Sequence, residues 1–269
     1  MLLPASSPPG RYLAFEELRQ IPFLFHLFTT RQCEQATSPG AGYTRINSFL
    51  EELGRREPVV SLKQMHGDTI RWVNDRDPHE GLEGDGLLTS VPGLLLGVRT
   101  ADCVPILLVD CRRRIVGNLH AGWRGTLRGI TASAIRQLLE GGSDVADLRV
   151  AFGPAIGSCC YQVGPEVVAA FRAEFPGADT FFSRQGPSRD RQRTDENADT
   201  GTRGRGEVEK ESKFLDLQKA NFAQAIGAGL RPHQVFRNAY CTHCDPETFH
   251  SYRRDGAKAG RMFALIGIQ

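Results

Sequence analysis

The sequence has no apolar run long enough to span a membrane, and it has little net charge. No uninterrupted apolar stretch reaches the roughly 18 residues that a transmembrane helix needs. The N-terminal region has no basic segment followed by a continuous apolar core, because proline and glutamate interrupt it, so it does not resemble a signal peptide. The net charge is only +2, which does not call for a nucleic-acid partner. We therefore expect a cytoplasmic protein that binds neither membranes nor nucleic acid.

Two nucleotide-binding motifs are missing, and histidine is scarce. Neither GxGxxG nor GxxxxGK[ST] occurs, which argues against both common nucleotide-binding loops. There are seven histidines and no His-x-His pair, whereas a multicopper centre needs many imidazole ligands. The seven cysteines are an odd number in a chain too long to need disulfide staples. Most of them are expected to be free thiols, packed as small apolar side chains.

Strand and helix patterns alternate irregularly along the chain. Apolar, β-branched segments predict strands within residues 58–73, 84–90, 93–101, 104–110, 115–121, 147–157, 234–239 and 261–268. Apolar residues at helical spacing predict helices within residues 126–142, 164–177 and 214–230. Several strands follow one another without a helix, which favours mixed sheets over a regular doubly wound fold. The predicted fold class is therefore α/β (α+β), with mixed β-sheets and helices on the outside, and the length suits one large domain or two small ones.

Some segments allow finer predictions. Strands 104–110 and 115–121 are apolar almost throughout, which indicates burial on both faces. Thr126 is a candidate cap for the first long helix, and two glycines at 141–142 would end it. Residues 183–213 are polar and lack aromatics, so we expect a mobile insertion, with a catalytic lid as the sharper alternative.

One cysteine and two histidines lie where predicted strands begin or end. They are His66 in KQMHGD, Cys103 in TADCVP and His120 in NLHAGWRG. Zinc accepts thiolate and imidazole together, and a catalytic zinc keeps one position open for water. The spacing has no local signature, however. The three residues are therefore either an open metal site or ordinary packed residues at strand ends.

Two further segments carry groups suited to binding an anion or a planar ring. In HAGWRGT, backbone amides at a helix start and Arg124 would favour an anion. Trp123 would stack on a planar ring or simply pack. In SYRRDG, Arg253 lies in a basic turn that would hold a phosphate or a carboxylate, or would only be solvated.

The remaining cysteines suggest structural roles. Cys241-x-x-Cys244 would fit a structural zinc or a redox pair, but no second CxxC completes a zinc ribbon. Cys159 and Cys160 are adjacent within a glycine-rich segment that we interpret as the lining of a pocket, without a disulfide between them. Cys111 follows an aspartate in a basic turn and is predicted to be structural.

Six blocks, in order, resemble one known family. They are KQMHGD, DGLLTS with GLLLGVRTADCVPILLVD, GNLHAGWRGT, FGPAIGSCCYQVG, FLDLQKAN, and CT with FHSYRRDG and GRMFALIGI. Together they resemble the laccase-domain family, whose bacterial members are described as polyphenol oxidases or purine nucleoside phosphorylases. The resemblance covers about residues 58–269. It implies a sandwich of mixed β-sheets flanked by helices, in a single domain of residues 1–269 with a variable N-terminal part at 1–57. It also implies an enzyme that cleaves adenosine, inosine and S-methyl-5'-thioadenosine with phosphate and deaminates adenosine.

The resemblance also implies the residues of the site. His66, Cys103 and His120 would be both the metal ligands and catalytic residues, with Zn²⁺ as the cofactor and Cu²⁺ as an alternative. Asp102 is the nearest acid or base in the sequence, although neighbouring residues on a strand point to opposite faces.

The implied substrates are a small nucleoside and phosphate. Arg124, Arg253 and Arg99 would hold the phosphate through charge-assisted bonds, and Trp123 would contact the substrate. The protein is expected to be a monomer or a small homo-oligomer.

Other functions stay open at this point. Cys103 would act as a nucleophile with a histidine base in a hydrolase, such as an amidase that edits cell-wall peptide precursors. A single copper in place of zinc would fit a polyphenol oxidase. A non-catalytic binding protein is the third alternative.

Overall fold

A computed structural model describes residues 1–4, 10–33, 43–75, 81–183 and 213–269. Two six-stranded sheets dominate this described part of the chain. The first has the order β1 (Leu2–Pro4), β2 (Tyr12–Phe15), β3 (Leu24–Thr29), β15 (Met262–Ile268), β7 (Leu95–Thr100), β4 (Val59–Ser61). The second has the order β14 (Val235–Phe236), β10 (Leu148–Phe152), β8 (Val104–Asp110), β9 (Ile115–Ala121), β6 (Gly86–Thr89), β5 (Ile70–Val73).

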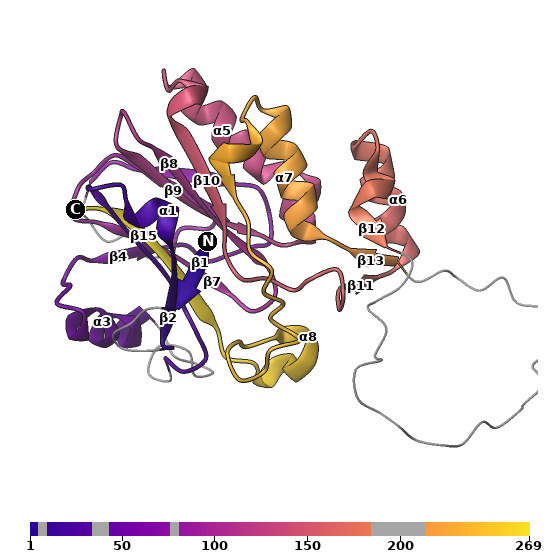
Figure 1. The fold of residues 1–269 in the computed structure, drawn as a ribbon, viewed down its shortest axis with the longest axis horizontal. Coiled ribbons are helices and arrows are strands. Elements are labelled where there is room, and N and C mark those ends of the chain that lie inside the picture. The colour runs from indigo at the N-terminus through magenta and orange to yellow at the C-terminus, as the bar shows by residue number, and fades with distance from the viewer. Residues whose placement is uncertain (5–9, 34–42, 76–80, 184–212) are drawn as a thin grey trace, which may run out of the picture.

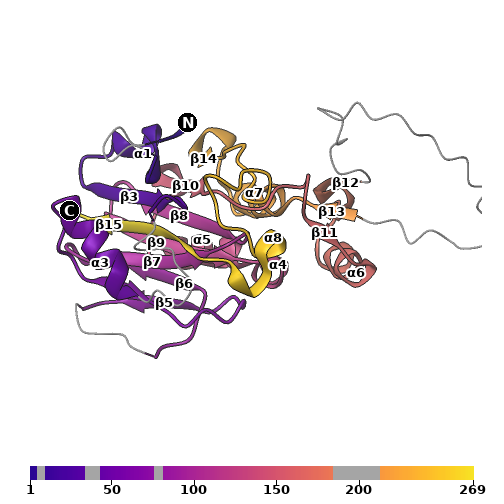
Figure 2. The ribbon, with the colours of Figure 1, turned by 90° about the horizontal axis from the view of Figure 1, so that it is seen from below.

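Both sheets are mixed, as predicted. The pairs β4–β7, β5–β6 and β10–β14 are parallel, and the other pairs in the two large sheets are antiparallel. A small third sheet has the order β11 (Gln162–Val163), β13 (Lys213–Leu215), β12 (Phe182–Ser183). It lies with α6 (Pro165–Glu174) at one end of the molecule, beyond α7 (Leu217–Gly227) (Figures 1 and 2).

Helices cover the outer faces of the two large sheets. Side chains of α3 (Tyr43–Glu52) pack against β3, β7 and β15 of the first sheet, and α5 (Ile130–Glu140) and α7 pack against the second. The layers therefore run helix, sheet, sheet, helix. The short helices α1 (Glu16–Arg19), α4 (Trp123–Leu127) and α8 (Tyr252–Asp255) lie at the ends of strands or loops.

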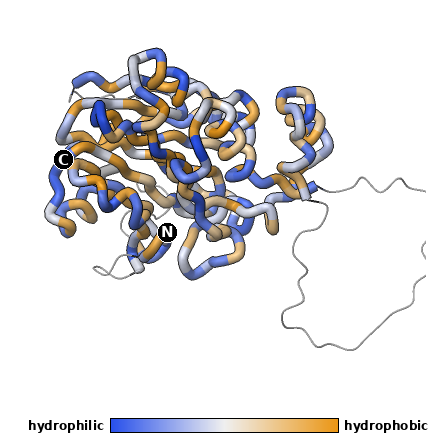
Figure 3. Tube along the Cα trace, turned by 45° about the horizontal axis from the view of Figure 1, so that its top comes forward, coloured by the Kyte–Doolittle hydropathy of each residue, from blue (hydrophilic) through white to orange (hydrophobic). Residues whose placement is uncertain are grey.

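The alternation of side chains along β15 shows why the strands are so apolar. Phe263 and Leu265 face α3, whereas Ala264 and Ile266 face the second sheet, and all four are buried. A strand that contacts a layer on each side needs apolar residues at every position. The same holds for β8 and β9, which are buried along their whole length. Apolar residues accordingly gather along the inner strands in Figure 3.

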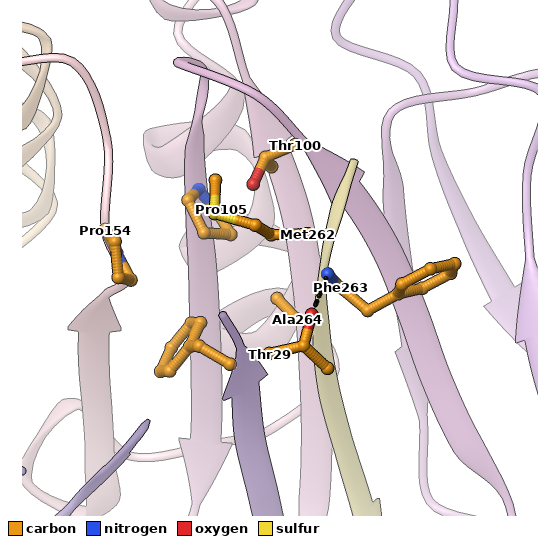
Figure 4. A pocket seen from close by; sticks show the side chains of 8 residues that line it. Thr29, Thr100, Pro105, Pro154, Met262, Phe263 and Ala264 are labelled. Atoms are coloured by element: carbon orange, nitrogen blue, oxygen red, sulfur yellow. Dashed lines mark hydrogen bonds between the residues drawn. The ribbon is translucent and has the colours of Figure 1, made fainter. Parts of the chain in front are cut away.

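Packing between the two sheets leaves little free space. Figure 4 shows a narrow gap where Thr100 and Met262 face Pro105 and Pro154 across the sheets. The gap has no space for a water molecule. At its edge the backbone amide of Phe263 donates a hydrogen bond to Thr29 Oγ1, 2.8 Å away. This part of the molecule is core and not a binding site.

Several local predictions were wrong at their boundaries. Thr126 does not cap the first long helix, because it lies within α4 and a separate helix, α5, starts after Gly129, whose φ is +77°. Residues 214–215 belong to β13, and Asp216 caps α7 by accepting a hydrogen bond from the Lys219 amide. The end of α5 before Gly141 is as predicted.

The predicted ends of the polar insertion also need correction. Ser183 and Lys213 belong to strands that pair through β12 and β13, so they are not part of a loop. The rest of the predicted insertion, 184–212, lies outside the described residues. The N-terminal part contributes β1, β2 and β3 to the first sheet, which the sequence analysis did not foresee. None of the described helices is long and apolar enough to cross a membrane.

Candidate active site

A cavity of about 920 Å³ opens where five separate segments of the chain meet. These segments are the β4–β5 connection, the β7–β8 turn, the end of β9 with α4, the β10–β11 connection, and the region around α8. The residues that line the cavity are Lys63, Gln64, His66, Arg99, Ala101, Asp102, Cys103, His120, Trp123, Arg124, Tyr161, Tyr252, Arg253, Ala257, Ala259 and Arg261. All eight site residues expected from the sequence are among them.

A β-hairpin brings Cys103 and His120 together. Strands β8 and β9 are antiparallel, with Val104 paired to Ala121, so the start of one strand lies beside the end of the other. Cys103 therefore comes next to His120 although 17 residues separate them in the sequence. Asp102, directly before Cys103, has a backbone φ of +94°, which residues other than glycine rarely adopt. This conformation turns the chain into β8.

His66 reaches the same place from the connection between β4 and β5. Its ring centroid lies 4.8 Å from that of His120, with the two rings nearly perpendicular. The Sγ atom of Cys103 and one nitrogen of each imidazole all lie within 4.8 Å of one another. We call these three residues the metal trio. His66 has a φ of +59°, so its backbone is held in a strained conformation at this point.

A buried carboxylate, Asp85, supports the trio from behind. Its Oδ1 accepts hydrogen bonds from the His66 amide at 2.9 Å and from His120 Nδ1 at 2.8 Å. Its Oδ2 accepts from the amides of Met65 at 3.1 Å and Gly67 at 2.7 Å. Asp85 thus shapes the loop that carries His66 and leaves Nε2 of His120 available to a metal, as carboxylates behind metal-binding histidines do.

Burial alone would raise the pKa of the Asp85 carboxyl, but the hydrogen bond from His120 and those from the backbone amides hold it below the usual value. The carboxyl is therefore ionised. The sequence analysis did not identify Asp85. Its only signal was an acidic residue between two glycines at the start of a predicted strand.

Glycines make room for the trio. A Cβ atom on Gly122 would lie 3.1 Å from Cys103 Sγ and 3.4 Å from His66 Cδ2. A Cβ atom on Gly125 would lie 2.5 Å from the carbonyl oxygen of Gly67. The glycines of HAGWRG thus serve close approach between segments, in addition to forming the turn into α4.

The thiol and imidazole of the trio shift each other's pKa. Burial alone would raise the pKa of Cys103, but the charges and hydrogen bonds of His120 and His66 lower it to about 6. Burial alone would lower the pKa of His120, but Cys103 and Asp85 raise it to about 9. Without a metal, the pair is a thiolate and an imidazolium near neutral pH. A thiolate is the form of cysteine that both binds metals and attacks as a nucleophile.

The trio fits a divalent metal of intermediate softness. It offers one thiolate and two imidazoles, the donor set that zinc and copper accept. Three protein ligands facing a cavity leave a further position for water or substrate. Within the described residues, the groups able to hold a metal contain only two imidazoles in total.

Asp102 lines the cavity, yet its carboxylate is engaged elsewhere. Oδ1 accepts a hydrogen bond from Thr242 Oγ1 and Oδ2 accepts one from the Arg253 amide, both at 2.6 Å. These bonds favour a role in positioning the segment that carries Arg253. The proposed role of Asp102 as an acid or base stays a prediction.

The three arginines expected to bind phosphate lie around the same cavity. The Arg253 guanidinium lies 5.0 Å from the centre of the Tyr161 ring and donates to the carbonyl of Gln162. The Arg124 guanidinium lies 4.4 Å from the centre of the Trp123 ring, so it covers one face of that ring. Five basic residues line the cavity altogether, namely Lys63, Arg99, Arg124, Arg253 and Arg261. Such a lining favours an anionic ligand.

Two tyrosines that the sequence analysis did not single out also line the cavity. Tyr252 is 54% exposed. Burial and the charge of Cys103 raise the pKa of Tyr161, so its hydroxyl stays protonated and able to donate a hydrogen bond. Nothing in the local sequence separates these residues from ordinary packing aromatics.

Comparison with known proteins places the chain among described relatives. The family model described as "Multi-copper polyphenol oxidoreductase laccase" matches residues 43–269, a range that starts upstream of residue 58, where the resemblance in the sequence begins. A protein from an unknown prokaryotic organism named "Adenosine deaminase RL5" is 32% identical over 78% of this chain and 75% of its own length. "Purine nucleoside phosphorylase YlmD" of Geobacillus stearothermophilus is 35% identical over 78% of this chain and 72% of its own length.

A solved structure shares the fold. The crystal structure of the Bacillus licheniformis hypothetical protein YfiH superimposes with a TM-score of 0.80 at 29% identity, covering 97% of each chain. These matches confirm both the predicted fold class and the resemblance drawn from the six sequence blocks. The chain therefore belongs to the multi-copper polyphenol oxidoreductase laccase family, the laccase-domain proteins.

Proposed function

We propose that the protein is a metal-dependent purine nucleoside phosphorylase. It would cleave adenosine, inosine and S-methyl-5'-thioadenosine with phosphate, releasing the free base and the sugar 1-phosphate, and it would also deaminate adenosine. The observation that carries the proposal is a single cavity that combines the metal trio with basic and aromatic side chains. Relatives named purine nucleoside phosphorylase and adenosine deaminase support it.

His66, Cys103 and His120 would hold the metal, with Zn²⁺ as the first choice and Cu²⁺ as the alternative. Zinc held by these residues would supply Lewis acidity and a water molecule that is nucleophilic near neutral pH, the chemistry that deamination of a purine requires. Asp85 accepts the hydrogen bond from His120 Nδ1 and so keeps Nε2 directed at the ligand position.

The other residues of the cavity bind and orient the substrates. Phosphorolysis needs a phosphate in line with the anomeric carbon, and Arg99, Arg124 and Arg253 would hold it by charge-assisted hydrogen bonds. Trp123, which lines the same cavity, would contact the purine ring. The hydrogen bond from the Arg253 amide to Asp102 fixes the segment that presents the guanidinium.

Purified protein with a measured metal content, incubated with adenosine in the presence and absence of phosphate, tests the proposal. We expect adenine release that requires phosphate, and deamination of adenosine to inosine that does not. With phosphate present, inosine is cleaved further to hypoxanthine. Both activities should be lost, together with one equivalent of metal, in His120→Ala. Cys111→Ser is the matched control, because Cys111 packs against the core between the sheets, away from the cavity. Adenine release without phosphate would contradict phosphorolysis.

A second function has a specific observation in its favour. Cys103, His120 and Asp85 form a chain of thiolate, imidazole and carboxylate, the arrangement of a cysteine hydrolase. In that case chelation would leave turnover of an amide substrate intact and a thiol alkylator would abolish it. We favour the metal-dependent phosphorylase, because His66 lies beside the same thiol and supplies a third side chain able to bind a metal.

A further inference from the structure

A second group of sulfur ligands lies outside the metal trio. The fold brings the Cys-x-x-Cys segment together with the adjacent cysteine pair, although more than 80 residues separate them in the sequence. The Sγ atoms of all four residues lie within 4.8 Å of one another. We call this group the four-cysteine cluster; its members are Cys159, Cys160, Cys241 and Cys244.

The sulfur positions fit one shared ion better than a disulfide. Cys244 Sγ lies 3.5 Å from Cys159 Sγ and 3.3 Å from Cys160 Sγ, so it contacts two sulfurs almost equally. A disulfide would join Cys244 to only one of them. A tetrahedral zinc with bonds of about 2.3 Å would hold four sulfurs about 3.8 Å apart, which matches the spacing of the cluster.

The backbone around the cluster is shaped for sulfur. The Gly157 amide donates a hydrogen bond to Cys241 Sγ at 3.2 Å, the kind of second contact that orients and stabilises a metal-bound thiolate. A Cβ atom on Gly157 would lie 3.0 Å from Cys159 Sγ and 3.3 Å from Cys241 Cβ, so a larger residue would push the sulfurs apart. The amides of Cys244 and Asp245 both donate to the Cys241 carbonyl, which folds the Cys-x-x-Cys segment into a tight turn.

We propose that the four-cysteine cluster is a structural Zn²⁺ site, separate from the metal trio. Four thiolates in closed tetrahedral coordination are a common ligand set of structural zinc in proteins. Cys244 is exposed, so an ion can enter from solvent. The cluster shares no ligand with the trio, and this inference does not depend on the proposed catalytic function.

The position of the cluster explains what the ion does. It would join the segments 155–161 and 241–245. These segments also meet through a bridge between Ala155 and Cys241, the hydrogen bond from the Thr242 amide to the Ala155 carbonyl, and the one from the Gly157 amide to Cys241 Sγ. Tyr161, directly after the cysteine pair, lines the active-site cavity, and Thr242 Oγ1 donates to Asp102. A zinc ion here fixes two parts of the cavity lining at once.

The metal content of the full-length chain, purified under reducing conditions with zinc present, tests this site. We expect two equivalents of zinc per wild-type chain and one in the double variant Cys159→Ser, Cys244→Ser. The control Cys111→Ser should keep two. One equivalent in the wild type that disappears with His66→Ala, His120→Ala would overturn the proposal.

A second measurement leaves the four-cysteine cluster intact, so it does not depend on the folding of cysteine variants. The variant His66→Ala, His120→Ala is loaded with Co²⁺, whose thiolate complexes absorb strongly in the visible and near-ultraviolet. We expect one equivalent of cobalt with the spectrum of tetrahedral sulfur coordination. Absence of this spectrum in the reduced protein, or a stable disulfide between Cys159 and Cys244 in protein supplied with zinc, would overturn the proposal.

Discussion

Replacing Asp85 with asparagine is the sharpest test of how the trio is held. The carboxylate is 1% exposed and accepts four hydrogen bonds, two at each oxygen. An asparagine has one oxygen in place of two. Whichever way its amide is turned, two of the four bonds are lost, and the NH₂ group then faces two N–H donors. At about 1.5–3 kcal/mol for each bond to a charged group, Asp85→Asn should lower the free energy of unfolding by about 3–6 kcal/mol.

The same substitution should weaken metal binding. His120 loses the acceptor that directs its ring, and the loop that carries His66 loses its anchor, so we expect a drop in zinc affinity of roughly 10- to 100-fold. Competition with a chromophoric chelator measures the affinity, and urea unfolding of the metal-free protein measures the stability. The matched control is Asp110→Asn, because Asp110 is also fully buried and accepts two backbone hydrogen bonds away from the cavity.

The two variants should differ in their zinc affinity. Asp110→Asn should keep wild-type zinc affinity and lose little stability, because both amides donate to the same oxygen, which an asparagine retains. Asp85→Asn should lose both stability and zinc affinity. Wild-type zinc affinity in Asp85→Asn would refute the reasoning, because it would show that the histidines of the trio are held in place without the carboxylate.

Three further outcomes follow from the structure. Gly122→Ala should lower both metal content and activity, because its Cβ would press on the thiol and a ring of the trio, whereas Gly227→Ala meets no atom within 4 Å and should change neither. Arg124→Gln should raise the KM for phosphate about 10-fold or more, with a smaller effect on kcat. The control Arg172→Gln, which removes an exposed ion pair, should leave this KM unchanged. A wild-type KM for phosphate in Arg124→Gln would exclude Arg124 from the phosphate site. Burial, aided by the charge of a nearby arginine, lowers the pKa of His26 to about 4, so the folded state favours the neutral ring and stability should fall as pH drops from about 6.5 towards 4. Urea unfolding across this range should show His26→Gln losing up to about 3 kcal/mol less than the wild type, and identical pH profiles would contradict the burial argument.

Part of the active site could be predicted from local sequence patterns. Cys103 and His120 flank two consecutive apolar strands, and a tight antiparallel hairpin must bring those ends together. That pair could be predicted from the sequence. His66 joins them only because β5, β6 and β9 are neighbours in the second sheet, and no local pattern specifies that order.

Supporting residues were harder to find than ligands. Asp85 and Tyr161 act through contacts with segments distant in the chain, so their roles have no signature in their own neighbourhood. The Cys-x-x-Cys motif lacked a second motif to complete it, and its partners proved to be an adjacent pair of a different spacing.

The sequence by itself determined the layers of this protein and the chemistry it can offer. Apolar runs without alternation require strands buried on both sides, and the reactive side chains stand where those runs end, because a buried strand has no room for them elsewhere. Only the tertiary structure decided which side chains share a site. Sheet order and turns such as the one at Gly157 set distances between segments far apart in the chain, and those distances depend on packing across the whole fold.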